Sequence, residues 1–155
     1  MATSAVPAAI DALVALLRAD AGLNHARILD GPPAQNFTER DRVYIGWSPG
    51  SDAAAEMQQS FASAGARQRD EEASISCYIE SHRGDTLVRN RRVCVFEMFA
   101  VIEAALRATN EEPTKPTLGN AVLWCEVAAG SLTQTQTDSG ALAGLAFTVN
   151  FRARI

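Results

Sequence analysis

The chain has 155 residues, enough for one domain with a sizeable core and too few for two full domains. Apolar residues make up 47% of the chain and charged residues 21%, the balance of an ordinary folded soluble protein. The net charge is -4 and the isoelectric point is about 5.2, which excludes a protein built mainly to bind the phosphates of nucleic acid. Contact with nucleic acid stays open.

The three cysteines (Cys77, Cys94 and Cys125) are far apart in the sequence and have no partner at metal-ligand spacing. Each has apolar neighbours, which predicts buried thiols in a reducing compartment. The chain begins without the basic segment of a signal peptide, and no apolar run approaches the ~20 residues that span a bilayer. We therefore expect a single domain over residues 1–155, folded in a cytoplasm, with no membrane, metal or cofactor.

Residues 5–20 are predicted to form an amphipathic helix. Its apolar residues recur at spacings that place them on one helical face, and they are Val6, Ile10, Leu13 and Leu17. Ser4 is the candidate N-cap of this helix.

Two short strands are expected next, at 26–30 and 42–47. The first ends where Gly31, Pro32 and Pro33 take the chain out of the sheet. In the second, alternation predicts that Val43, Ile45 and Trp47 share one face. The following segment, 48–70, is polar, so we interpret it as an exposed excursion with at most some irregular strand.

A third strand is predicted at 72–81 because apolar and polar residues alternate along it, with Ala73, Ile75, Cys77 and Ile79 facing inward. Such alternation is typical of a sheet with one buried face. Asp70, Glu71 and Glu72 stand at its start and are expected to lie in a solvated loop.

The longest helix is predicted at 86–108, with Val88, Val95, Phe99, Ile102 and Leu106 as its apolar stripe and Phe96 beside Phe99 in the core. Its first turns carry Arg89, Arg91 and Arg92, a charge that the helix dipole disfavours. Either these side chains form a solvated face or they pair with carboxylates of a partner subunit.

Two further strands are expected at 121–129 and 145–155, joined through a polar segment, 131–140, that we interpret as the tip of a projecting hairpin. Around Trp124 both faces of the strand are apolar, which hints at a subunit interface. Strands grouped around two helices predict an α+β fold. We expect a mostly antiparallel sheet of about five strands, packed against the N-terminal helix and the long central helix.

The segment from Gly46 to Gly50 matches the G-x-S-x-G pattern of a serine hydrolase. Pro49 follows the serine, however, and has no N–H for an oxyanion hole. His82 is the sole downstream histidine and lies at a strand end, while His25 has no metal partner at ligand spacing. We therefore expect a strand-ending turn at Ser48, and no enzyme.

The order of these elements resembles that of tail terminator proteins of long-tailed bacteriophages. The segments that carry the resemblance are Val6 to Leu17, Arg27 to Pro33, Asp41 to Trp47, Ala73 to Glu80, Phe99 to Ile102 and Phe147 to Phe151. They span nearly the whole chain as patterns of residue type. The resemblance implies a small α+β subunit of a six-fold ring in the virion, at the head-proximal end of the tail.

Such a ring ends tube polymerisation and docks the head, so the implied partners are other copies of the chain, the tail tube protein and the head-tail connector protein. Genome DNA would pass through the ring without specific binding, which suits an acidic chain. The candidate contact residues are Arg89, Arg91, Arg92, Trp124, Leu132, Thr133, Gln134, Thr135, Gln136 and Thr137. The alternatives are a head-tail connector component on the portal side and a small non-enzymatic binding domain.

Overall fold

The computed structural model describes residues 2–34, 38–65 and 67–155. Two helices, α1 and α2, and six strands make up the described part, together with two short 3-10 helices, η1 and η2. In chain order the elements are α1 (Val6–Ala19), η1 (Ala21–Leu23), β1 (Arg27–Asp30), β2 (Asp41–Ile45), β3 (Ala55–Phe61), β4 (Arg69–His82), α2 (Val88–Leu106), η2 (Lys115–Thr117), β5 (Trp124–Thr137) and β6 (Gly140–Arg154). The predicted α+β class is confirmed.

The sheet has the order β1-β2-β4-β6-β5, and β3 pairs with β4 beside this path. Only β1 and β2 are parallel; the other pairs are antiparallel. Along one edge β4 has two partners, because β2 pairs with residues 77–81 and β3 with residues 69–75. The sheet has one strand more than the five expected, and this additional strand, β3, lies in the segment expected to be an exposed excursion. It is indeed exposed, and without a buried face it has no apolar alternation that a sequence reading could detect.

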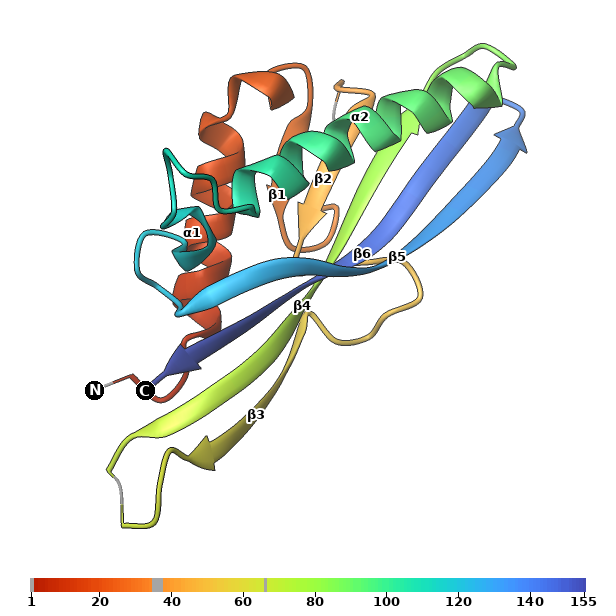
Figure 1. The fold of residues 1–155 in the computed structure, drawn as a ribbon. Coiled ribbons are helices and arrows are strands. Elements are labelled where there is room, and N and C mark those ends of the chain that lie inside the picture. Colours follow the sequence, from red (N-terminus) through yellow and green to blue (C-terminus); the bar gives the residue numbers. More distant parts are fainter. Residues whose placement is uncertain (1, 35–37, 66) are drawn as a thin grey trace.

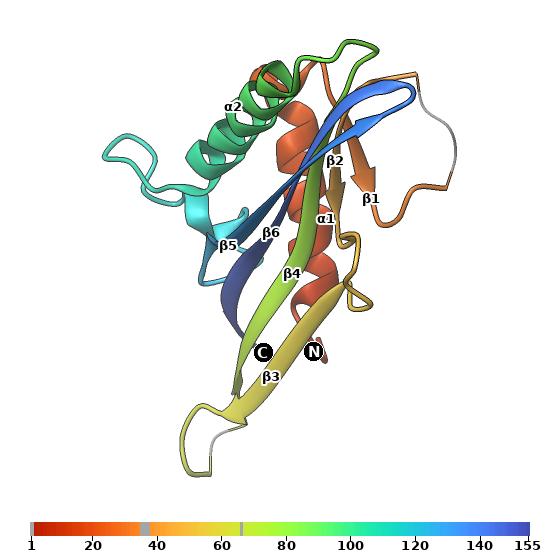
Figure 2. The ribbon, with the colours of Figure 1, turned by 90° about the vertical axis from the view of Figure 1, so that its right-hand side faces the viewer.

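Both helices cover the same face of the sheet, and the described residues place no helix on the other face (Figures 1 and 2). The core fills the space between this face and the helices, and its largest fully buried apolar side chains include Leu13, Leu17, Ile45, Ile75, Ile79, Met98, Ile102 and Phe151. The N- and C-termini lie near each other beside the start of α1 (Figure 1). No helix in the described ranges is long and apolar enough to cross a membrane.

The buried face of α2 differs in part from the predicted stripe. Val95, Ile102 and Leu106 are buried as expected, and Met98 joins them at 1% exposure. Phe99 packs on Phe147, with ring centroids 5.3 Å apart. The expectation of a core position for Phe96 is wrong, since its side chain remains 43% exposed.

The end of β2 also differs from the prediction. Gly46 has φ +79 and turns the chain out of the strand, so Trp47 does not continue the face of Val43 and Ile45. Its ring instead packs on Tyr44, with centroids 4.9 Å apart, and on Tyr78, at 6.0 Å. A small aromatic cluster therefore lies on the helix-free face of the sheet.

The C-terminal hairpin is confirmed, and its strands are longer than predicted. β5 continues to Thr137 and pairs with β6 as far as Gly140, so most of the expected tip belongs to the ladder. A register shift between Val127 and Gly130 interrupts the pairing. No side chain of this outer part of β5 is buried, so the sequence has no apolar alternation there that predicts where the strand ends.

Candidate functional site

The hydrolase-like segment forms a turn between β2 and β3, as predicted. The backbone N–H of Ser51 donates to Ser48 O at 3.2 Å, and the side chain of Ser48 is buried at 6% exposure. His82 lies at the end of β4, where its Nε2 is 3.3 Å from Ser139 Oγ. Ser48 is therefore a buried residue of a strand-ending turn.

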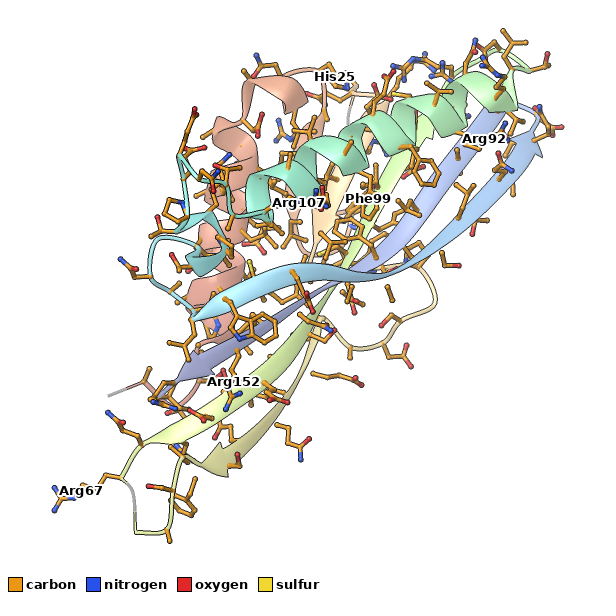
Figure 3. All side chains as sticks on the ribbon, viewed as in Figure 1. His25, Arg67, Arg92, Phe99, Arg107 and Arg152 are labelled. Carbon is orange, nitrogen blue, oxygen red and sulfur yellow. The ribbon has the colours of Figure 1, made fainter. Side chains whose placement is uncertain are left out.

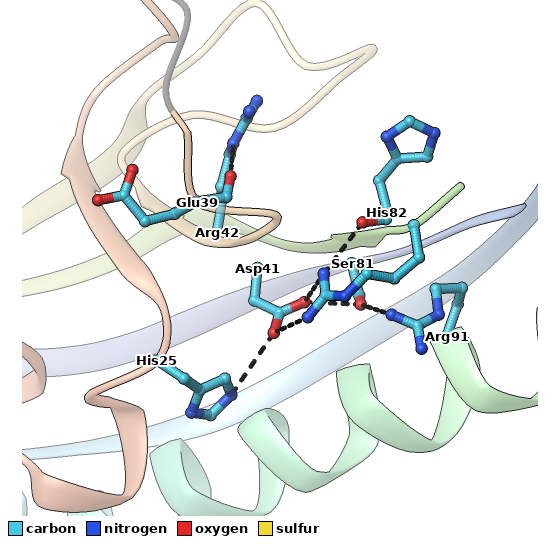
Figure 4. A network of polar contacts seen from close by, with 8 residues as sticks. His25, Glu39, Asp41, Arg42, Ser81, His82 and Arg91 are labelled. Carbon is cyan, nitrogen blue, oxygen red and sulfur yellow. Dashed lines mark hydrogen bonds and ion pairs between the residues drawn. The ribbon is translucent and has the colours of Figure 1, made fainter. Parts of the chain in front are cut away.

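A buried polar network joins the start of β2 to the end of β4 and the first turns of α2 (Figure 4). Asp41 is 2% exposed, and its carboxylate accepts from Ser81 Oγ at 2.7 Å and from both terminal nitrogens of Arg83, at 3.0 and 2.9 Å. Burial alone would raise the pKa of Asp41, but these hydrogen bonds outweigh it and hold the pKa below its ordinary value. The network thereby fixes β2 and β4 to the start of α2.

Arg91 belongs to this network and does not form the exposed basic face expected of it. Its Nη1 donates to Ser81 Oγ at 3.3 Å, and its Nε is buried without a partner among the described residues. Arg92 also contacts its own chain, because its Nη1 donates to Gln134 Oε1 at 2.7 Å. Of the three arginines, Arg89 alone is exposed, while Arg91 and Arg92 are half-buried.

A metal ion at this network is disfavoured by its electrostatics. One ligand atom each from His25, Asp41 and Cys94 lies within 4.8 Å of the others. The carboxylate of Asp41 is already bound by Arg83 and Ser81, however, so a cation would have to displace a guanidinium group. Burial also raises the pKa of the Cys94 thiol, which disfavours the thiolate that metals bind. We assign this cluster a structural role.

The structure brings the predicted hairpin residues next to the start of α2. Besides the contact between Gln134 and Arg92, the side chain of Gln136 donates from Nε2 to Thr86 O at 2.8 Å. Thr133 and Thr135 alternate with these glutamines and so point to the helix-free face. Along the face that carries the glutamines, Leu132 is 36% exposed.

β5 is an edge strand, paired with β6 on one side only. From Val127 to Thr137 it carries no charged residue and no proline, and every position from Ala128 on is exposed. Native proteins usually protect a long sheet edge with charges, proline or short strands. The bulge between Val127 and Gly130 is the protective feature that β5 has.

Trp124 lies at the other end of β5, some ten residues and roughly 30 Å of extended chain away from Gln134. Cys125 faces the core and is 4% exposed, whereas Trp124 is 41% exposed and Leu123 is 50% exposed. The candidate contact residues therefore form two separate groups, one at each end of the β5–β6 hairpin.

The sequence reading missed the burial of the acidic cluster. Asp70 and Glu71 belong to β4 and are 8% and 0% exposed, so the expected solvated loop is wrong. Arg152 and Arg154 bind Asp70, while Glu71 receives hydrogen bonds from the start of α1. The partners of these carboxylates lie 12 to 84 residues away in the chain, and local composition carries no signal for them.

Comparison with protein-family models and with curated protein sequences finds no match for this chain.

Proposed function

We propose that this protein is a structural subunit that forms a ring at the head-proximal end of a bacteriophage-type tail tube, ends tube polymerisation and joins the tail to the head. The observation that carries the proposal is the open edge of β5, 14 residues long and uncharged from Val127 onward. Such an edge presents unpaired backbone N–H and C=O groups to another chain.

The surface beside this edge suits the same role. Arg92 contacts Gln134, Phe96 follows one helical turn after Arg92, and Leu132 precedes Gln134 on the same strand face. The side chains of Phe96 and Leu132 are 43% and 36% exposed, so an apolar strip lies next to the polar contact between Arg92 and Gln134. Exposed apolar side chains next to an open edge favour association with a protein partner.

The geometry of the sheet also favours a ring. β5 forms one edge, and β1 and β3 lie on the opposite side, so edge-to-edge contact between copies is head-to-tail. A head-to-tail contact gives a closed ring when its rotation closes. The resemblance to tail terminators sets the expected copy number at six, with tube protein on one ring face and the head-tail connector on the other. A net charge of -4 per copy suits a lumen that lets DNA pass without binding it.

The first test is the assembly state of the purified chain, by sedimentation velocity and negative-stain electron microscopy. We expect uniform rings. Thr135→Lys places a charge on the β5 edge and should abolish them, whereas Ala104→Lys adds the same charge on an exposed position of α2 and should not. A monomer at every concentration, or equal effects of the two variants, would contradict the proposal.

A second measurement separates a terminator from a connector. Rings added to a polymerising tail tube protein should stop tube growth at one end. Rings that leave tube length unchanged and bind the portal complex would favour the connector component instead.

A further inference from the structure

In the described part of the chain, three strands have one side without a neighbouring strand, and they are β5, β1 and β3. The edge of β1 is closed by its own chain, because Arg18 of α1 donates to Ile28 O from Nη2 at 3.2 Å and from Nε at 3.4 Å. β1 is also only four residues long, with the charged Arg27 and Asp30 at its ends. Short, charged edges resist pairing with another chain.

β3 has no such protection on its outer side. Its seven residues include one charge, Glu56, and no proline, and all of them are at least partly exposed. Phe61 and Met57 are 72% and 57% exposed, the highest fractions of any large apolar side chain in the described ranges. β3 and β5 are therefore the two edges that remain open to a partner.

The backbone hydrogen bonds show which residues of β3 face outward. The N–H of Ser76 donates to Ala54 O at 2.9 Å, and hydrogen-bonded pairs alternate along an antiparallel ladder, so the even-numbered residues of β3 bond to β4. The residues that direct their N–H and C=O groups to the open edge are Ala55, Met57, Gln59 and Phe61. Their side chains lie on the helix side, since Gln59 donates to Glu71 Oε2 beneath the start of α1.

The outer part of β5 has the same arrangement. The N–H and C=O of Ala141 both bond to residues 83–85, on the side of β6 away from β5. Ala141 pairs in register with Gln136, so the backbone groups of Gln136 face the open edge, and by alternation those of Gln134 and Leu132 do too. The side chains of these residues lie on the helix side, where both glutamines contact the start of α2.

These two edges are compatible with each other. Residues directly opposite in a sheet carry their side chains on the same face, so joining β5 to β3 of a second copy keeps the helices of both copies on one side. β3 and β5 run in opposite directions within one copy, so they pair antiparallel between copies of the same orientation. We propose that the outer part of β5 pairs with β3 of a neighbouring copy. This inference rests on the proposed ring and names the strand that covers its open edge.

The seam between β5 and β3 also covers exposed apolar side chains. In the register that sets Leu132 opposite Phe61, Gln134 lies opposite Gln59, so apolar meets apolar and amide meets amide. The apolar strip of Leu132 and Phe96 then contacts Phe61 of the neighbour. Neither strand places a charged side chain on the helix side of this seam, so the pairing buries no charge of its own.

The pairing joins opposite ends of two molecules. Figure 3 shows Arg92, which contacts the outer part of β5, and Arg67, in the loop that follows β3, far apart at the two ends of the protein. The contact is therefore head-to-tail and staggers neighbours along their strands, so the strands tilt against the ring axis, as in sheets that close on themselves. Two β5 edges paired about a two-fold axis would instead stop at a dimer.

Disulfide cross-linking tests the pairing. Under mild oxidation the double variant Phe61→Cys/Leu132→Cys should give a reducible ladder of covalent oligomers, because the Cα atoms of such a pair lie about 5.5 Å apart, within reach of a disulfide. Either single variant and wild type should run as monomers on the same non-reducing gel. The matched control is Phe61→Cys/Thr133→Cys, which should form no ladder, since Thr133 points to the other face of β5.

A backbone variant tests the same contact in any register. Met57→Pro removes an outward N–H from β3, a change that an edge strand tolerates, and should abolish rings in sedimentation velocity. Asp30→Pro makes the same change on the closed edge of β1 and should leave rings intact, because Gly31 and not Asp30 donates to β2.

The outcomes separate this contact from the ring itself. If wild type forms rings but the Phe61→Cys/Leu132→Cys ladder is no stronger than its control and Met57→Pro still assembles, the contact is overturned and the proposed ring stands. Dimers of Leu132→Cys alone would reveal a two-fold β5 pair and also overturn the contact. A wild-type chain that remains monomeric overturns both.

Discussion

Glu71 on β4 caps the start of α1, because its Oε1 accepts the backbone N–H of Ala5 at 2.8 Å. The same oxygen accepts from Ser4 Oγ at 3.0 Å, and Oε2 accepts from Gln59 Nε2 at 2.6 Å. Ser4, the predicted N-cap, stands one residue before the N-cap position, which Ala5 occupies, and its Oγ accepts the N–H of Val6 at 3.1 Å. One fully buried carboxylate thus joins α1, β3 and β4.

Glu71→Ala should lower the free energy of unfolding by about 2 kcal/mol, since it removes a cap and leaves buried donors unpaired. Urea unfolding at a concentration where the chain is monomeric measures this loss. Glu72→Ala is the neighbouring control: its exposed side chain has no described partner, and the expected change is within about 0.5 kcal/mol. Equal losses in the two variants would show that the cap contributes little.

The pairing of Asp70 with two arginines predicts acid sensitivity. Hydrogen bonds from Arg154 and then Arg152 lower the pKa of Asp70 to about 2, whereas aspartate in an unfolded chain titrates near 3.9. A pKa depressed by folding stabilises the protein above the unfolded value, and that stabilisation is lost as the pH falls from about 4 towards 2.

Asp70→Asn should therefore flatten the fall in unfolding free energy between pH 5 and pH 2, measured by urea titration at each pH. Some slope remains, because the pKa of Asp41 is also lowered. Asp52→Asn, at an exposed position without a described ion pair, should keep the wild-type slope. An unchanged slope in Asp70→Asn would contradict the assignment of this acid sensitivity to Asp70.

The close approach of Tyr78 to Gly144 gives a steric prediction. A Cβ at residue 144 would lie 1.9 Å from the Tyr78 hydroxyl oxygen and 2.7 Å from its Cε2. The ring cannot easily move aside, because Tyr44 and Trp47 pack against it, each with centroids 6.0 Å away.

Gly144→Ala should thus cost roughly 1–3 kcal/mol of stability, the usual penalty for overpacking. Gly130→Ala is the comparison on the neighbouring strand, since its Cβ would meet Leu145 Cδ1 at an ordinary 3.8 Å. Thermal and urea unfolding of the two variants should differ clearly, and similar stabilities would argue against a rigid Tyr78.

Periodicity predicted the elements whose burial is one-sided. The alternation of Ile75, Cys77 and Ile79 placed β4 correctly, and the spacing of Leu13 and Leu17 did the same for α1, because a half-buried strand or helix must repeat its apolar residues at its own period. Periodicity could not predict β3 or the outer half of β5, since neither has a buried face.

The sequence by itself therefore determined the α+β class, the two helices and the inward faces of the central strands, since each follows from spacing within one segment. Only the tertiary structure decided which polar side chains are buried and which partners they contact. It buried Glu71 under α1, turned Arg91 towards Ser81 and left Arg89 exposed. These outcomes depend on which distant segment supplies a partner, because a buried charge is tolerated only where such a partner satisfies it.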